Sequence, residues 1–206
     1  AEPLYKQAIA LMQEILGERH PNVATSINNL AGLYESQGRY EEAEPLYKQA
    51  LALRQEILGE RHPDVASSIN NLAALYESQG RYEEAEPLYK QALALRQELL
   101  GERHPDVASS INNLALLYKS QGRYEEAEPL YKQALALRQE LLGERHPDVA
   151  SSINNLAGLY RSQGRYEEAA TLYMKALKIL EVLLGLEHPN TKTVRNNLKS
   201  LRDLQN

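Results

Sequence analysis

The chain has 206 residues, a formal charge of −5 and no cysteine. The lack of cysteine excludes disulfides and thiolate metal sites, and the acidic balance argues against a general nucleic-acid binder, which carries a basic excess. No apolar run approaches the roughly 20 residues that span a bilayer, so we expect no membrane partner and a cytoplasmic location.

The sequence repeats itself every 42 residues. Residues 43–84 and 85–126 differ at three positions, and residues 85–126 and 127–168 differ at two. Nine glycines stand 21 residues apart and divide each unit into halves. Glycine accepts the left-handed backbone that ends many helices, so each half is predicted to be one helix with a short connector. A fixed period of this size predicts a stack in which each repeat packs on its neighbours.

In chain order, we expect residues 1–17 to be the second helix of a truncated repeat, because Ala1 is equivalent to Ala43. Each following repeat has two helices, which we call the A helix and the B helix. In the second repeat the A helix is expected at Pro63–Gln79, with proline at a favoured first-turn position, and the B helix at Glu83–Leu100. Their short connector predicts antiparallel packing. The predicted repeats are residues 18–59, 60–101, 102–143 and 144–185.

Residues 186–206 are expected to form a final A helix that caps the stack. Charged residues replace the Ile, Ala and Tyr of the preceding repeat at Arg195, Lys199 and Arg202. In the other repeats these positions face the next helix, so a charged version suits a solvent-exposed end. The leading helix has no such replacement. Its apolar residues, Leu4 and Ile9 among them, should be exposed unless another chain covers them.

Small residues and aromatic residues recur in one fixed pattern within the repeat. In the second repeat the pattern consists of Leu72, Ala73, Tyr76, Gly80, Tyr82, Ala85, Tyr89 and Ala92. It resembles the tetratricopeptide repeat family, and the 42-residue unit is similar to that of kinesin light chains and their bacterial, notably cyanobacterial, relatives. The resemblance covers essentially the whole chain. It implies an all-α fold, a single right-handed superhelical solenoid of antiparallel helix pairs.

The resemblance also implies a concave groove that is lined by the A helices and holds a peptide. Carried over to this sequence, it assigns to the groove Asn28, Asn29, Asn70, Asn71, Asn112, Asn113, Asn154 and Asn155, together with Glu35, Ala74, Glu77, Leu116, Lys119 and Arg161. An asparagine amide both donates and accepts, so it can pair with a peptide main chain without reading its sequence. Alternatively, one asparagine of each pair bonds within the stack and fixes helix packing.

The internal repeats vary mainly on this face. Four of the five differences among them fall at two groove positions, one occupied by Ala, Leu or Gly and the other by Glu, Lys or Arg. The charge along the groove is acidic at Glu35 and Glu77 and basic at Lys119 and Arg161. We therefore expect a protein or peptide ligand with acidic residues near the two cations and apolar side chains near Leu116. Free drift of exposed positions is the alternative.

Five histidines recur once per loop, each before a proline: His20, His62, His104, His146 and His188. A metal site needs three or four converging ligands, and each loop supplies one imidazole. We interpret them as residues that open a helix, and we expect no metal and no cofactor.

Three arginines, Arg54, Arg96 and Arg138, lie on the apolar side of their B helices. Met12 and Leu180 hold the equivalent positions in the outer repeats. An arginine that exchanges with apolar residues is expected to lay its methylenes on the core and to point its guanidinium outward.

The sequence favours a protein-interaction scaffold that binds an extended or helical peptide in the groove. The alternative is a passive spacer, or an array that self-associates end to end through the leading helix. No phosphate-binding glycine loop, nucleophile–base pair or metal cluster in the sequence supports an enzyme.

Overall fold

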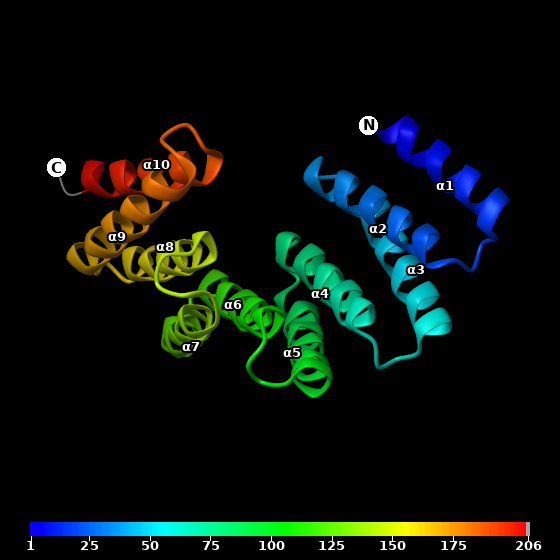
Figure 1. Ribbon diagram of the computed structural model, residues 1–206, viewed down its shortest axis with the longest axis horizontal. Helices are drawn as coiled ribbons and strands as arrows, with labels where there is room; N and C mark the ends of the chain where they lie inside the picture. Colours follow the sequence, from blue (N-terminus) through cyan, green and yellow to red (C-terminus); the bar gives the residue numbers. More distant parts are fainter. Residues whose placement is uncertain (205–206) are drawn as a thin grey trace. The chain divides into compact units, whose positions relative to one another are not determined.

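The computed structural model describes residues 1–204, which contain ten α-helices and no strand (Figure 1). The helices are α1 (Glu2–Leu16), α2 (Pro21–Ser36), α3 (Tyr40–Leu58), α4 (Pro63–Ser78), α5 (Tyr82–Leu100), α6 (Pro105–Ser120), α7 (Tyr124–Leu142), α8 (Pro147–Ser162), α9 (Tyr166–Leu184) and α10 (Pro189–Asp203). The all-α prediction is confirmed, and the predicted bounds of α4 and α5 are correct to within one residue.

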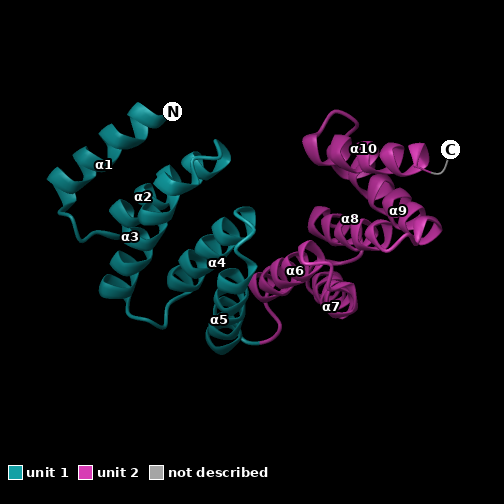
Figure 2. Cartoon of the chain, turned by 180° about the vertical axis from the view of Figure 1, so that it is seen from behind, with its two compact units in different colours: residues 1–101 teal, residues 102–206 magenta. Residues whose placement is uncertain are grey.

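The chain forms two compact units, Ala1–Gly101 and Glu102–Asn206, which are coloured separately in Figure 2. The first unit contains α1–α5 and the second contains α6–α10. Within each unit an A helix packs extensively on the B helix that follows it, as α4 does on α5 and α8 on α9. It also packs on the B helix that precedes it, as α4 does on α3 and α8 on α7.

The helix ends follow from one histidine and one glycine per repeat. Each A helix opens with a proline, and the preceding histidine Nδ1 accepts a hydrogen bond from the backbone N–H two residues further on, for example from Asp64 to His62 at 3.1 Å. The histidines therefore open the helices, as predicted. Each B helix ends at a glycine such as Gly59, with φ 80° and ψ 162°. Essentially only glycine adopts this backbone conformation.

The core is built from three helices at a time. In the first unit, Val65 and Ile69 of α4 pack against Ala92 of α5 and are joined by Leu51 of α3 and Leu95 of α5. Buried alanines at the helix crossings allow the backbones to approach closely, because they add almost no side-chain volume. Within the two units, α4 is thus packed between α3 and α5, and α8 is packed between α7 and α9.

A polar network crosses the same boundary. Glu44 of α3 accepts hydrogen bonds from Tyr76 Oη at 3.1 Å, from Arg81 Nη1 at 2.7 Å and from Lys48 Nζ at 2.6 Å. The Arg81 guanidinium stacks over the Tyr76 ring, 4.0 Å from its centroid, and also pairs with Glu84. Lys48 and Arg81 lower the pKa of Glu44 to about 2. Glu2 and Glu128 have the same arrangement with their own tyrosines and arginines.

The prediction that the B-helix arginines point outward is wrong. Arg54 is only 8% exposed, and its Nη1 donates to Ser68 Oγ at 2.8 Å while its Nη2 donates to Thr25 Oγ1 at 3.3 Å. Arg138 makes the same bonds to Ser152 and Ser109, at 2.7 and 3.1 Å. Burial lowers the pKa of Arg54. The guanidinium therefore ties together the A helices of two successive repeats.

The two outer helices differ in what they expose. No residue of α1 is buried, and Leu4 and Ile15 are 70% and 69% exposed. On α10, the side chains of Lys199 and Arg202 are exposed, whereas Arg195 is half-buried and forms an ion pair with Glu181 at 3.2 Å. That α10 caps the stack stays a prediction.

The Glu44 network predicts a pH dependence of stability. The pKa of Glu44 falls from 4.5 to about 2 on folding. A lowered carboxyl pKa stabilises the fold above the unfolded value, and this stabilisation is lost as the pH falls through the folded value. We expect the free energy of unfolding, measured with urea, to decline between about pH 4.5 and pH 2. We expect Glu44→Gln to weaken this decline and to cost about 1 kcal/mol at neutral pH.

The matched control is Glu41→Gln, which removes an exposed acid at the start of the same helix. Equal losses of stability and equal pH profiles in the two variants would contradict a special role for the network.

Candidate peptide-binding surface

The asparagines of the A helices bond across repeat boundaries. Their side-chain amides are joined from Asn71 to Asn28, from Asn155 to Asn112 and from Asn197 to Asn154, at 2.9–3.0 Å. Both asparagines of the pair Asn154–Asn155 therefore bond within the stack. An amide has two donors and two acceptor lone pairs, so one bond of this kind leaves further capacity for a ligand. Contact of these asparagines with a peptide stays a prediction.

In the first unit, the variable charged position is occupied by glutamates held by tyrosines. Tyr47 Oη donates to Glu35 at 2.7 Å, and Tyr89 Oη donates to Glu77 at 2.8 Å. Burial, followed by the neighbouring carboxylates, raises the pKa of both tyrosines. The hydroxyls therefore remain donors at neutral pH and fix the carboxylates on the surface of α2 and α4.

In the second unit, the same position is occupied by Lys119 of α6 and Arg161 of α8. Both line a pocket of about 360 Å³, whose wall is made by Leu116, Lys119, Tyr131, Asn154, Asn155, Gly158, Arg161, Ser162, Tyr173, Asn197 and Leu204. Burial and the positive charge of Arg161 lower the pKa of Lys119. Within residues 1–204, neither cation forms an ion pair with a carboxylate.

The structure brings together five of the predicted groove residues in this pocket, namely Leu116, Lys119, Asn154, Asn155 and Arg161. Asn112 is buried beside the helix contact, while Asn113 is half-buried. The predicted residues Asn28, Asn29, Glu35, Asn70, Asn71, Ala74 and Glu77 lie on α2 and α4 of the other unit.

Sequence reasoning missed the tyrosines beneath this surface. Tyr131 and Tyr173 line the pocket, and the positive charge of Arg161 opposes the rise that burial causes in the pKa of Tyr173. A tyrosine stands 12 residues after each variable charged position, as Tyr89 does after Glu77. This constant spacing in the sequence could have identified the tyrosines as neighbours of the variable charged positions.

Because Gly158 has no side chain, it leaves space for the side chain of Lys119. A Cβ at this position would lie 3.2 Å from Lys119 Nζ and 3.6 Å from Tyr173 Oη. The equivalent residue of the preceding repeat is Leu116, which is 40% exposed. The pocket thus combines two cations, one exposed leucine and a glycine that leaves space between them.

The described residues hold no group of three or more His, Cys, Asp or Glu side chains suited to a metal ion. Over the same part of the chain, every helix is too short or too polar to cross a bilayer.

The tetratricopeptide repeat family model matches residues 1–56, 23–98, 64–140, 106–181 and 148–206. The chain belongs to the tetratricopeptide repeat family. Members of this family generally mediate protein–protein interactions and are typically non-enzymatic scaffolds. A search of curated proteins gives no significant match.

Two solved structures resemble this tetratricopeptide repeat chain. BtubC (BKLC) from P. vanneervenii has a TM-score of 0.77 and 32% identity, over 97% of this chain and 79% of that one. A kinesin-light-chain-like protein of Podosopora anserina with nearly identical repeats has a TM-score of 0.71 and 30% identity, over 89% of this chain and 87% of that one. The kinesin-light-chain type of repeat is therefore confirmed.

The space at Gly158 predicts the effect of adding a single methyl group. We expect Gly158→Ala to stabilise the repeat by about 0.5–1 kcal/mol, because glycine within a helix is unfavourable by that amount. The new Cβ should displace the Lys119 ammonium toward solvent, so that the pKa of Lys119, measured by NMR, rises toward its ordinary value.

The control is Gly32→Ala, at the equivalent position of the first repeat, where the Cβ would meet Tyr47 Oη at 3.3 Å. It should leave the Lys119 resonance unchanged. If the pKa of Lys119 is the same in Gly158→Ala and in the parent chain, the added Cβ does not displace the Lys119 ammonium and the prediction is wrong.

Proposed function

We propose that this tetratricopeptide repeat chain is a scaffold that binds an extended or helical peptide segment on the surface of its A helices. The observation that carries the proposal is the cation pair Lys119 and Arg161, which lines a pocket without a carboxylate partner. The family's general role in protein–protein interaction supports it.

The electrostatics of the pocket favour an acidic ligand. Burial lowers the pKa of Lys119, and the neighbouring positive charge of Arg161 lowers it further, so the two cations are partly removed from water and repel each other. A ligand carboxylate would relieve this repulsion and would form charge-assisted hydrogen bonds with both groups. Elsewhere in the chain, arginines such as Arg81 and Arg165 already have carboxylate partners. The pocket is therefore a part of the A-helix surface that can accept an acidic side chain.

The residues around the two cations further restrict which ligand the pocket can bind. Leu116 offers exposed apolar area beside the cations, and the amides of Asn154 and Asn155 line the same pocket. An apolar residue next to the ligand's acid would cover Leu116, and the amides would pair with the ligand main chain. Glu35 and Glu77 in the first unit would repel acids, so we propose that acidic ligand residues occupy only the second unit.

Exchanging charge between the two units tests this assignment. A peptide is first selected on the parent chain from a random display library, and its affinity is then measured by fluorescence polarisation. The double variant Glu77→Lys with Lys119→Glu keeps the net charge and should weaken this peptide by at least about tenfold, which corresponds to 1.4 kcal/mol. Affinity for the parent should also fall with added salt, because ions screen exposed charge pairs.

The matched control exchanges Glu187 and Lys192, an exposed ion pair at the start of α10. It should leave affinity unchanged. Peptides that lack acidic residues, or that bind the Glu77/Lys119 double variant as tightly as the parent, would rule out the proposed mode.

A second candidate function is end-to-end self-association, which the exposed apolar residues of α1 favour. The side chains of Leu4 and Ile15 are largely exposed to solvent. If a second copy covers them, the sedimentation coefficient should rise with protein concentration, and Leu4→Gln with Ile15→Gln should remove the rise by removing apolar contact area. A constant monomer mass in the parent chain would exclude this candidate.

A further inference from the structure

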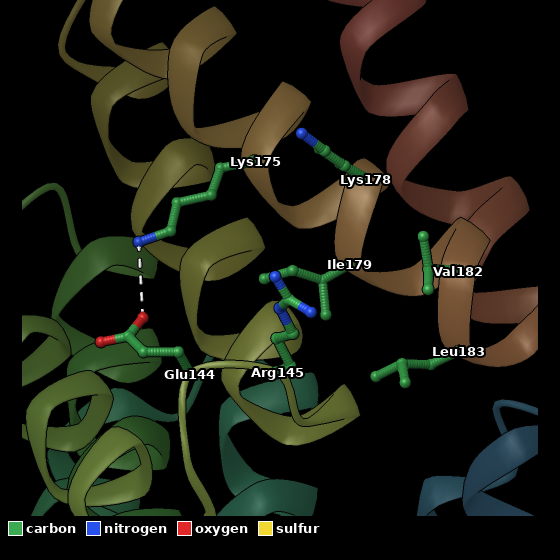
Figure 3. Close-up of a pocket in the computed structure, with 7 residues that line it drawn as sticks. All are labelled: Glu144, Arg145, Lys175, Lys178, Ile179, Val182 and Leu183. Atoms are coloured by element: carbon green, nitrogen blue, oxygen red, sulfur yellow. Dashed lines mark ion pairs between the residues drawn. The ribbon is translucent and has the colours of Figure 1, made fainter.

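A second pocket lies in the same unit, on a surface that shares no lining residue with the Lys119 pocket. It has a volume of about 370 Å³ and is lined by Glu144, Arg145, Lys175, Lys178, Ile179, Val182 and Leu183 (Figure 3). The first two residues lie in the loop between α7 and α8, and the other five lie on α9. It is thus formed where the loop that opens the last repeat approaches the B helix of that repeat.

In the three earlier repeats, an ion pair spans this place. The loop arginine pairs with a glutamate of the following B helix in Arg19–Glu56, Arg61–Glu98 and Arg103–Glu140. In the last repeat, Val182 stands where the glutamate would be. Within residues 1–204, Arg145 therefore has no carboxylate partner. Val182 itself is 77% exposed, so packing does not account for its apolar side chain.

Two more replacements at the same place change the charge in the same direction. Lys175 replaces Gln133, and Lys178 replaces Ala136. The site thus loses one carboxylate and gains two ammonium groups relative to the preceding repeat. Lys175 lies 3.7 Å from Glu144, and Lys178 has no carboxylate partner within residues 1–204.

The equivalent pocket of the first unit serves as an internal comparison. It is lined in part by Glu18, Arg19, Gln49, Leu53 and Glu56. Those residues correspond to Glu144, Arg145, Lys175, Ile179 and Val182 of the last repeat. The fold therefore forms this pocket in both units. Of these two pockets, only that of the last repeat combines added lysines with an exposed valine.

Figure 3 shows how these groups lie. The Arg145 guanidinium lies beside Ile179, the side chains of Val182 and Leu183 follow along α9, and the Glu144–Lys175 pair stands to one side. An unpaired guanidinium suits a carboxylate because its planar donors bind both oxygens. Exposed branched residues beside it suit an apolar side chain, because contact would remove their surface from water.

We propose that this surface, formed by Arg145, Lys175, Lys178, Ile179, Val182 and Leu183, docks a protein segment in which an acidic residue stands next to a bulky apolar one. The acid pairs with Arg145 and Lys178, and the apolar side chain covers Ile179, Val182 and Leu183. A hollow of this size admits one or two side chains. The carboxylate of Glu144 at its wall, and the net charge of −5, oppose attachment to an anionic bilayer. The proposal does not depend on a ligand at Lys119 and Arg161.

The test reverts the last repeat to the residues of its neighbours. The variant Lys175→Gln, Lys178→Ala, Val182→Glu carries side chains that the three other repeats hold at these positions, so it is expected to fold, as checked by circular dichroism. A random-peptide display library is panned on the parent chain after depletion on the reverted variant. The enriched peptides should contain Asp or Glu beside Leu, Ile or Phe. They should bind the reverted variant at least about tenfold more weakly.

A graft supplies the matched gain of function. Gln133→Lys, Ala136→Lys and Glu140→Val transfer the three replacements to the preceding repeat, where Arg103 takes the place of Arg145. The same peptide should then bind with a stoichiometry of two instead of one by calorimetry. Lys119→Ala with Arg161→Ala should leave this binding unchanged.

Several results would overturn the proposal. One is the failure of any peptide to distinguish the parent from the reverted variant; another is enrichment of neutral or basic peptides. Binding lost only in Lys119→Ala with Arg161→Ala would place the ligand in the other pocket. Dimerisation that the reversion abolishes would assign the surface to a second copy. Binding to phosphatidylserine vesicles that the reversion abolishes would assign it to a membrane.

Discussion

The packing of an A helix between two B helices, as of α4 between α3 and α5 and of α8 between α7 and α9, is the contact on which the rest of the structure depends. Ile69 packs with Leu51 of the preceding repeat and with Ala92 of its own, so neither repeat completes the core alone. A repeat of this type has no separate core, and its stability comes largely from the interface with its neighbours. Any substitution on these faces is felt by two repeats, and the internal repeats correspondingly keep the same buried residues. Four of the five differences among the internal repeats fall at two positions on the A-helix surface.

Polar contacts also join helices of consecutive repeats, and they occupy polar side chains at the boundaries between repeats. Arg54 joins Thr25 to Ser68, Glu44 joins Tyr76 to Arg81, and Asn71 bonds Asn28. These bonds fix the register of one repeat on the next, because each needs donor and acceptor within about 3 Å. They also determine which polar side chains remain available to bind a ligand. Within residues 1–204, several cations have no carboxylate partner, and Lys119, Arg161, Arg145 and Lys178 are those that line the two pockets described above.

The sequence predicted the helices well because their signals are local. The apolar period, the proline of the first turn and the terminal glycine place α4 and α5 to within one residue. The side-chain partners were less accessible, since they depend on distances between helices. The amphipathic pattern put Arg54 on the inner face, but could not show that its guanidinium meets Ser68. A signal did exist, because Leu180 replaces the arginine and Val194, on the A helix that follows, replaces its serine partner. Likewise, the variable charged positions were identifiable, whereas the pocket needed the placement of Tyr131 and Tyr173.

The last repeat separates changes that serve packing from changes that do not. Leu180 and Val194 stand where other repeats have a hydrogen-bonded arginine and serine, and both apolar side chains are buried, so these positions remain part of the core. Val182 replaces one member of an ion pair, yet it is exposed and leaves Arg145 without a counterion. A packing explanation requires the new apolar side chain to lose contact with water, and Val182 does not. Solvation alone favours the original glutamate there. What the replacement does provide is an apolar edge beside a freed guanidinium, and such an edge is stabilising only when another molecule covers it.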